Sequence, residues 1–363
     1  MSLAIGVLGA AKIVKSGLLD PAEEVEGVEV TAIAARDLER ARAYAAEHGV
    51  PRVLGSYEEI LNDPDVDAVY VPTPSALHGH WTRRAIAAGK HVLCEKPFTA
   101  NADEAAEIGE LAQASGLVVM EAFHSRHHPM WARMAAVLGT GTIGEVRDAR
   151  AAFTVPHPDT SDIRWRLDLG GGALMDLGVY PVHLLRFLFG EPRVREARAH
   201  DVHGVDASMT AALAFPGGAT GEVVASMREE DGYAAELLVT GSDGSLHVRM
   251  PYHPYLYGLM TTTTASGTVT EEGDPRTSYA FQLEAFRDAV RDGRPAVTGA
   301  REATATMRVI DTIYRAAGMY PRTPYESVPV TPPSPRPAVP RQADGVRPAA
   351  SPAPPDRRPE PRA

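Results

Sequence analysis

The chain reads LAIGVLGAAKI at residues 3–13, and this stretch decides the fold. Its first six residues form a continuous apolar run, which is typical of a strand buried on both faces. A glycine turn follows, so that Gly9 and Ala11 stand where the fingerprint G-x-G-x-x-G has its first two glycines. Only the first is a glycine, and Val14 stands at the third position. The stretch therefore fits a dinucleotide-binding domain and a plain strand-to-helix turn about equally.

Strands and helices continue to alternate as far as residue 121. Further buried strands are predicted at residues 28–34, 68–72, 91–94 and 118–121, with helices at 38–46, 81–88 and 103–114. Alternation at this spacing predicts an α/β fold with a doubly wound parallel sheet, the Rossmann arrangement, over residues 1–123.

The pattern changes in the second half of the chain. Strand-like segments joined by glycine turns occur at residues 146–155, 194–200, 208–215, 220–227, 236–240 and 245–248. Strands without intervening helices predict an α+β domain at 124–328, with a large, mostly antiparallel open sheet. Two late helices at 279–291 and 300–317 are expected to pack back on the first domain. Residues 329–363 hold twelve prolines and six arginines, which predicts a disordered tail.

Composition excludes several classes of partner. The 363 residues carry a formal net charge of −11, which argues against nucleic acid and anionic membranes. No apolar run approaches the roughly 18 residues of a membrane span, and no basic leader precedes the first strand. The single Cys94 lies in an apolar run and predicts a buried thiol in a reducing compartment. We therefore expect a cytoplasmic protein.

The end of the second predicted strand indicates which dinucleotide binds. An NAD site expects an acidic residue there, whereas the 2′-phosphate of NADP is bound by arginine. Here the strand ends Ala34-Ala35-Arg36-Asp37, which favours NADP and leaves NAD as the alternative. Otherwise Arg36 is a surface charge beside Asp37, which would cap the next helix in either case.

Glu95-Lys96-Pro97 follows the predicted strand at 91–94 and so places a lysine at a carboxyl edge of the sheet. Open α/β sheets bind their ligands at this edge. An ammonium there can stabilise a developing oxyanion, although a lone lysine is more often a solvated surface charge.

These motifs together resemble the glucose-fructose oxidoreductase and inositol dehydrogenase family. The resemblance rests on residues 6–13, 34–37, 71–74 with His78, 88–97 and 170–180. It is closer to the branch of dimeric dihydrodiol dehydrogenases and NADP-linked aldose (xylose-type) dehydrogenases, and it spans about residues 3–325.

The resemblance implies catalytic roles for Lys96, Asp176 and Tyr180. It places Lys96 beside the nicotinamide, and Tyr180 stands where inositol-type members have a histidine that accepts the proton. We hypothesise that Tyr180 takes the hydroxyl proton, that Lys96 lowers the pKa of Tyr180, and that Asp176 orients either Lys96 or the substrate hydroxyl. A spacing of four puts Asp176 and Tyr180 on one helix face. Otherwise Tyr180 is a core aromatic.

Further residues follow from the resemblance or from their place in the pattern. Expected cofactor contacts are Gly6, Gly9, Ala11, Lys12, Ile13, Arg36, Thr73, Pro74, His78, Glu95, Lys96, Arg164 and Trp165, with a core aromatic as the alternative for Trp165. Glu121, His124, Arg126 and His183 are candidates for substrate contact, and His183 fits a structural role as well. Consecutive histidines at 124–128 diverge along the chain, so no metal is expected.

Three functions remain open at this level. The first is an NADP-dependent oxidoreductase acting on a sugar or cyclic diol, and the second is a sugar 3-ketoreductase of a deoxysugar pathway. The third is a non-catalytic NADP-binding sensor on the same scaffold. The resemblance also implies a homodimer or homotetramer formed through the C-terminal sheet.

Overall fold

The computed structural model describes residues 2–325. The predicted tail at 329–363 and the predicted end of the second domain at residue 328 lie outside the described residues. The division predicted between residues 123 and 124 follows the last strand of the first sheet, and as a domain boundary it stays a prediction.

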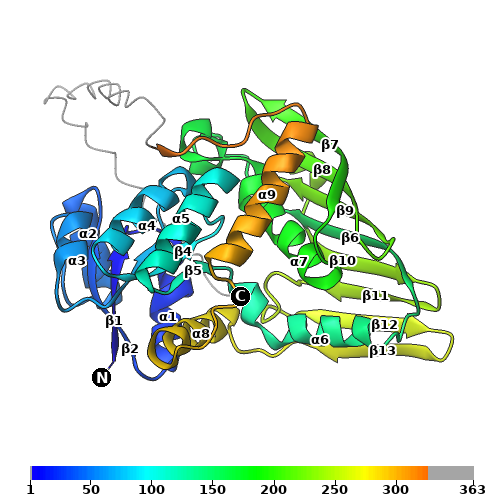
Figure 1. Ribbon diagram of the computed structural model, residues 1–363, viewed down its shortest axis with the longest axis horizontal. Coiled ribbons are helices and arrows are strands. Elements are labelled where there is room, and N and C mark those ends of the chain that lie inside the picture. The colour runs from blue at the N-terminus through cyan, green and yellow to red at the C-terminus, as the bar shows by residue number, and fades with distance from the viewer. Residues whose placement is uncertain (1, 326–363) are drawn as a thin grey trace, which may run out of the picture. The chain divides into compact units, whose positions relative to one another are not determined.

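The first sheet has five parallel strands in the order β2-β1-β3-β4-β5 (Figure 1). Its strands are β1 (Leu3–Leu8), β2 (Val28–Ala34), β3 (Ala68–Val71), β4 (His91–Glu95) and β5 (Val119–Ala122). β3 and β5 are buried along their whole length, as expected for strands covered on both faces. The predicted doubly wound sheet is therefore confirmed.

Helices connect these strands. They are a π-turn at Lys15–Leu19 that leads into α1 (Asp20–Glu24), then α2 (Leu38–His48), α3 (Tyr57–Asn62), α4 (His78–Ala87) and α5 (Ala102–Ser115). Asp37 caps α2 as predicted, because its Oδ1 accepts a hydrogen bond from the Arg40 amide at 3.0 Å. The single Cys94 is fully buried, and burial raises the pKa of its thiol.

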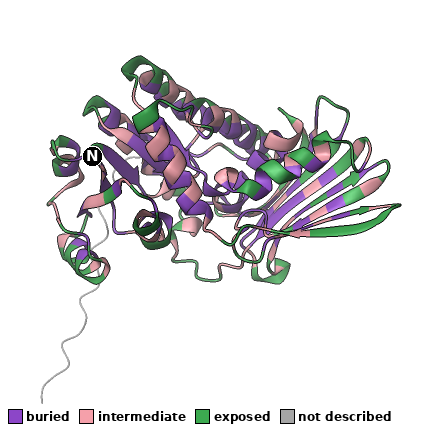
Figure 2. Ribbon diagram, turned by 90° about the horizontal axis from the view of Figure 1, so that it is seen from below, coloured by how far each residue is buried: buried purple, intermediate pink, exposed green. Residues whose placement is uncertain are grey.

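The second sheet has eight strands in the order β13-β12-β11-β10-β6-β9-β8-β7. They are β6 (Val146–Thr154), β7 (Arg193–Val202), β8 (Val205–Ala214), β9 (Thr220–Ser226), β10 (Ala234–Gly241), β11 (Gly244–Arg249), β12 (Leu259–Thr264) and β13 (Gly267–Glu272). Only the β6–β9 pair is parallel, so the prediction of a mostly antiparallel sheet is confirmed. Buried and more exposed residues alternate along β10, and Figure 2 shows the same alternation across neighbouring strands.

The remaining helices tie the second sheet to the first. α7 (Val179–Phe189) packs on β6 and β9, α8 (Ser278–Asp292) packs on α1, and α9 (Ala300–Ala316) packs on both α5 and β7. Both late helices thus contact helices of the first 123 residues. The sequence pattern did not indicate α3, α6 (Pro129–Gly139), β12 or β13.

One helical segment, Leu167–Phe189, is long and apolar enough by composition to cross a membrane. Its most apolar window is 78% buried inside the protein, as in the core helix of a globular domain. This helical segment includes Asp176 and Tyr180, so the fold buries it around two of the predicted catalytic residues.

Candidate active site

Two buried carboxylates hold the turn that carries Lys96. Glu95 ends β4 and accepts a hydrogen bond from the Tyr70 hydroxyl at 2.5 Å. Glu121, in β5, accepts one from the amide of Phe98 at 2.9 Å. Burial raises the pKa of Glu95 and raises that of Glu121 to about 8. The carboxyl ends of β4 and β5 therefore fix the backbone on both sides of Lys96.

Lys96 is held by Asp176, as the sequence hypothesis proposed. The Lys96 ammonium donates to Asp176 Oδ1 at 3.0 Å and to the Asp176 backbone carbonyl at 2.7 Å. Arg164 donates to the other carboxylate oxygen at 2.6 Å. Burial alone would raise the pKa of Asp176, but these two cations hold it well below its ordinary value. Asp176 is thus a carboxylate shared by two cations.

Tyr180 lies beside Lys96, one helical turn beyond Asp176. The Lys96 ammonium is 5.1 Å from the centroid of its ring, and its hydroxyl is 3.3 Å from Nε2 of His124. Burial raises the pKa of Tyr180 well above its ordinary value, and the nearby Tyr279 and Glu95 raise it further. The net lowering of this pKa that the sequence hypothesis expected is therefore not found, and the Lys96 ammonium is bound to Asp176 and lies over the Tyr180 ring.

Three consecutive glycines precede this helix and explain how it enters the site. A Cβ on Gly171 would lie 2.4 Å from the carbonyl oxygen of Arg164, and one on Gly172 would lie 2.1 Å from Asp206. Gly170 and Gly172 also have φ of +80° and +138°. The glycines therefore let this segment pass close to the protein's own chain.

The carboxyl ends of β1 and β3 fit a dinucleotide. The strand order reverses beside β1, which is where open α/β sheets bind such ligands. Gly9 has φ of +139°, so the turn after β1 requires a glycine, and Ala11, Lys12 and Ile13 continue from it. The hydroxyl of Thr73, after β3, is buried without a hydrogen-bond partner. A free buried hydroxyl beside Pro74 suits a polar ligand at this edge.

The comparisons with known proteins agree with this geometry. Residues 3–123 match an oxidoreductase family with an NAD-binding Rossmann fold, and residues 131–247 match the GFO/IDH/MocA C-terminal domain. A D-xylose 1-dehydrogenase (NADP(+)) from Haloferax volcanii is 40% identical over 318 residues, covering 86% of this chain and 96% of the relative. The chain belongs to the GFO/IDH/MocA oxidoreductase family.

Other relatives of the family reduce keto sugars. A dTDP-3,4-didehydro-2,6-dideoxy-alpha-D-glucose 3-reductase from Streptomyces violaceoruber is 44% identical over 257 residues, covering 70% of this chain and 74% of the relative. The crystal structure of a 3-ketoreductase from Actinomadura kijaniata in complex with NADP and TDP-benzene matches with a TM-score of 0.80. The two sequences are 31% identical, and the match covers 87% of this chain and 98% of the chain in that crystal structure.

Sequence reasoning missed Arg40 as a candidate for cofactor binding in this oxidoreductase. The guanidinium of Arg40 donates to the backbone carbonyl of Ala10 at 2.7 Å, so it lies against the turn after β1. Arg36 and Arg40 both act electrostatically on the Tyr57 hydroxyl, which places the two arginines near one another. The signal in the sequence was a second arginine shortly after Arg36, in the first turn of α2, where helical periodicity does not yet relate the two.

Two of the predicted cofactor residues, His78 and Gly6, contact the protein's own chain. Both ring nitrogens of His78 face backbone carbonyls, those of Pro97 and Thr73, at 2.7 and 2.6 Å. Gly6 packs under α3, since a Cβ there would lie 2.5 Å from Ile60. His78 thus contacts the protein's own backbone, and the predicted cofactor contacts of His78 and Gly6 stay predictions.

The predicted substrate residues divide into two groups. His124 reaches Tyr180, and Glu121 lies beneath the Lys96 turn. His183 instead stacks on Phe123 with ring centroids 4.2 Å apart. Arg126 covers the Phe187 ring at 3.8 Å. The structure does not bring His183 and Arg126 to the catalytic cluster.

Trp165 donates to the backbone carbonyl of His157 at 2.9 Å and is partly buried. It therefore holds the segment that carries Arg164 to Asp176. Its predicted contact with the cofactor stays a prediction.

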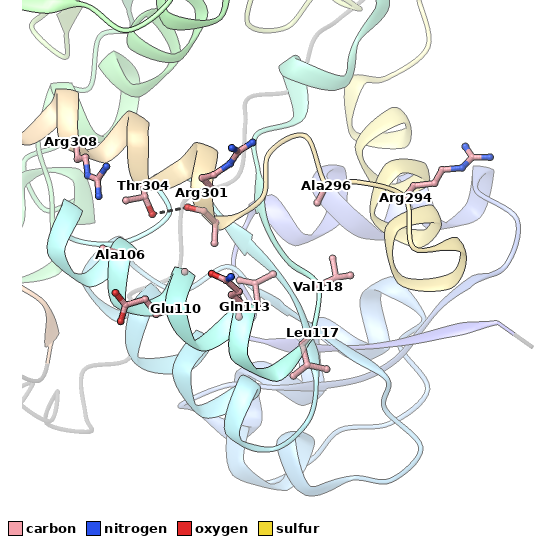
Figure 3. A pocket seen from close by; sticks show the side chains of 14 residues that line it. Ala106, Glu110, Gln113, Leu117, Val118, Arg294, Ala296, Arg301, Thr304 and Arg308 are labelled. Atoms are coloured by element: carbon pink, nitrogen blue, oxygen red, sulfur yellow. Dashed lines mark hydrogen bonds between the residues drawn. The ribbon is translucent and has the colours of Figure 1, made fainter.

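A cavity of about 530 Å³ lies between α5 and α9, away from this cluster (Figure 3). Its lining includes Glu110, Gln113, Arg301, Thr304 and Arg308, and none of the predicted site residues. The cavity is therefore separate from the cluster of Lys96, Asp176 and Tyr180, whose catalytic role stays a prediction. Within residues 2–325, no cluster of three or more metal-ligating side chains occurs.

Proposed function

We propose that the protein is an NADP-dependent oxidoreductase that acts on a secondary or hemiacetal hydroxyl of a sugar or cyclic diol, or on the matching carbonyl. The observation that carries this proposal is the convergence of Lys96, Asp176 and Tyr180 at the carboxyl edge of the first sheet. An ammonium and a phenol in one buried cluster can stabilise and protonate a sugar oxygen.

The bound dinucleotide would supply or accept the hydride. The turn after β1 and the hydroxyl of Thr73 would bind it, and Arg36 and Arg40 would hold the 2′-phosphate that distinguishes NADP from NAD. Arginine suits this contact because its guanidinium binds phosphate with two parallel hydrogen bonds. Relatives that use or bind NADP support this preference.

The chain's own residues then act on the substrate oxygen. Lys96 stabilises the negative charge that develops on this oxygen, and Asp176 fixes the position of Lys96 through two hydrogen bonds. Arg164 holds the opposite oxygen of Asp176, so the carboxylate cannot rotate away. Tyr180 transfers the hydroxyl proton at its Oη.

A second candidate is a sugar 3-ketoreductase of a deoxysugar pathway. The 44% identity to the 3-reductase from Streptomyces violaceoruber favours it. The same three residues would act in the reverse direction, since a proton donor for reduction is a proton acceptor for oxidation. A non-catalytic sensor is less well supported, because binding alone does not require a lysine and a phenol together.

We further propose that the protein forms a homodimer through the outer face of the second sheet and acts in the cytoplasm. Leu238 is 38% exposed on β10, between its cross-strand neighbours Arg150 and His247. An exposed leucine among ion-paired side chains suits a protein interface. The buried, unpaired Cys94 is compatible with a reducing compartment.

The test is to measure the absorbance of the reduced nicotinamide while a panel of substrates is offered. Aldoses and cyclic diols are offered with NADP or NAD, and keto sugars, including a dTDP-linked keto sugar, with the reduced cofactors. Turnover of an aldose or diol with NADP supports the first proposal. Turnover of the dTDP-linked keto sugar alone moves the assignment to the second candidate. Tight NADP binding without turnover in either direction would favour the sensor.

A further inference from the structure

His124 connects the phenol of Tyr180 to the hydroxyl of Ser278. Its Nε2 lies 3.3 Å from Tyr180 Oη, and its Nδ1 lies 2.7 Å from Ser278 Oγ. His124 is 1% exposed and Ser278 is fully buried. Three side chains from the end of β5, from α7 and from the start of α8 thus form one buried chain of hydrogen-bonding groups.

The ring of His124 is fixed on both faces. It stacks on Tyr279 with centroids 3.9 Å apart and lies 5.0 Å from the ring of His253. The titratable groups that face it are Lys96, His127, His128, Tyr180, His253 and Tyr279. Burial lowers the pKa of His124 well below its ordinary value, and the positive charge of Lys96 and of any protonated neighbouring histidine lowers it further. The ring is therefore neutral near pH 7, and one of its nitrogens has a lone pair that can accept a proton.

Tyr180 needs such an acceptor. Its phenol carries its own proton near neutrality, since burial raises its pKa. A protonated phenol can take a second proton from a substrate hydroxyl only if it passes the first one on. Within residues 2–325, Nε2 of His124 is the sole side-chain atom in hydrogen-bond contact with Tyr180 Oη.

We propose that His124 accepts the phenolic proton of Tyr180 as Tyr180 takes the hydroxyl proton of the substrate, forming a proton relay. This inference rests on the proposed function. The substrate O–H bond breaks as a new O–H bond forms on Tyr180, and the former O–H bond of Tyr180 breaks as an N–H bond forms on Nε2. The electron pair of the substrate C–H bond leaves as the hydride that the dinucleotide accepts. The reduction of a carbonyl follows the same steps in reverse.

The relay requires the tautomer of His124 that carries its proton on Nδ1. In this tautomer Nδ1 donates to Ser278 Oγ, and the lone pair of Nε2 faces Tyr180 and can accept. The Ser278 hydroxyl also stabilises the imidazolium that forms during the transfer. His124 is thus a positioning residue that acts through Tyr180, and Ser278 is the partner of its other ring nitrogen.

The first test is the pH profile of kcat in the oxidising direction for His124→Gln. The glutamine amide oxygen can still accept a hydrogen bond from Tyr180 but cannot take a proton. We expect kcat to fall about 10²-fold near pH 7 and then to rise about tenfold per pH unit, because only ionised Tyr180 can act. The wild type should stay flat over this range. A His124→Gln profile as flat as that of the wild type would overturn the relay.

His183→Gln is the matched control. Like His124, His183 is a buried histidine. It lies on α7, the helix that carries Tyr180, and its Nδ1 contacts the hydroxyl of Thr306. A merely structural loss should lower stability and leave the shape of the pH profile unchanged. A rising profile in both variants would overturn the assignment to His124.

The second test does not depend on turnover. Nitrogen-15 NMR of labelled histidines in the full chain with NADP bound reports which nitrogen of His124 carries the proton. We expect protonated Nδ1 and bare Nε2, and a shift of this balance in Ser278→Ala. A proton on Nε2 in the wild type would contradict the relay. If the NMR result agrees but the wild type turns over no sugar or diol, the proposed function fails while the hydrogen-bond direction stands.

Discussion

The two sheets differ in what they leave exposed. The inner strands β3 and β4 and the strand β5 of the first sheet are almost wholly buried, so their ends are what can meet a ligand, and Lys96 stands at one such end. The second sheet packs one face on α7 and α9 and leaves the other partly exposed, as Leu238 shows (Figure 2). The difference teaches that the side chains proposed for catalysis lie at the ends of buried strands, whereas the exposed face of the second sheet is available for contact with another protein.

The largest effect is expected at the carboxyl end of β4. Lys96→Met should lower kcat about 10³-fold, because it removes the charge that stabilises the substrate oxygen, while NADP affinity changes little. Steady-state kinetics with NADP-binding titrations measures both quantities.

The matched control is Lys90→Met, just before the opposite end of β4. Lys90 donates to the backbone carbonyls of Asp63 and Val66 at 2.7 and 2.6 Å and lies away from the cluster. Its removal should leave kcat unchanged. Equal losses in the two variants would show that β4 tolerates no change at either end and would remove the special role of Lys96.

Glu121→Gln tests how the buried Glu121 side chain contributes to stability at the carboxyl edge of the first sheet. The folded-state pKa of Glu121 is raised to about 8 by burial, whereas the unfolded value is about 4.3. Between these values the native state holds a proton that the unfolded state has lost, so wild-type stability falls as the pH rises. The glutamine variant keeps an acceptor for the Phe98 amide and lacks this loss.

We therefore expect Glu121→Gln to match the wild type near pH 4 and to exceed its free energy of unfolding by about 5 kcal/mol near pH 9. Urea denaturation at the two pH values measures the difference. A constant gap at both values would mean that Glu121 does not titrate within the fold.

A smaller effect is expected at the end of β2. Arg36→Ala and Arg40→Ala should each weaken NADP binding about tenfold and leave NAD binding unchanged, since a hydrogen bond to a charged group contributes about 1.5 kcal/mol. Arg42→Ala is the control, because Arg42 pairs with Glu39 on the same helix at 2.6 Å. Fluorescence titration with NADP and with NAD measures the two affinities in each variant. An equal loss of NAD affinity would rule out a contact between these arginines and the 2′-phosphate.

The smallest effect on the monomer is expected on the outer face of the second sheet. Leu238→Glu should change the free energy of unfolding by no more than about 0.5 kcal/mol, because Arg150 lies opposite the new carboxylate. It should nevertheless dissociate the proposed dimer, with kcat unchanged. Analytical ultracentrifugation measures this, and an unaltered dimer would place the interface elsewhere.

The sequence predicted the first sheet well because its strands are short, mainly apolar segments that alternate with helices. The same pattern did not predict β12, because threonine is a polar residue and yet Thr262 is buried in this strand. The convergence of Lys96 with Asp176 could be inferred only through resemblance, since 80 residues separate the two.

The contacts of His124 had no signal in the sequence. They join residues 56 and 154 positions away, and no periodicity links such distances. The raised pKa of Tyr180 was likewise hidden, because it depends on the depth of burial that α7 acquires in the assembled fold.

The central claim is that Tyr180 transfers the substrate proton in this cluster. The most direct measurement is kcat for Tyr180→Phe beside the wild type on the best sugar or diol of the panel, with NADP affinity measured in both. The account predicts a loss of at least about 10²-fold in kcat with NADP affinity preserved. Turnover by Tyr180→Phe at the wild-type rate would contradict it.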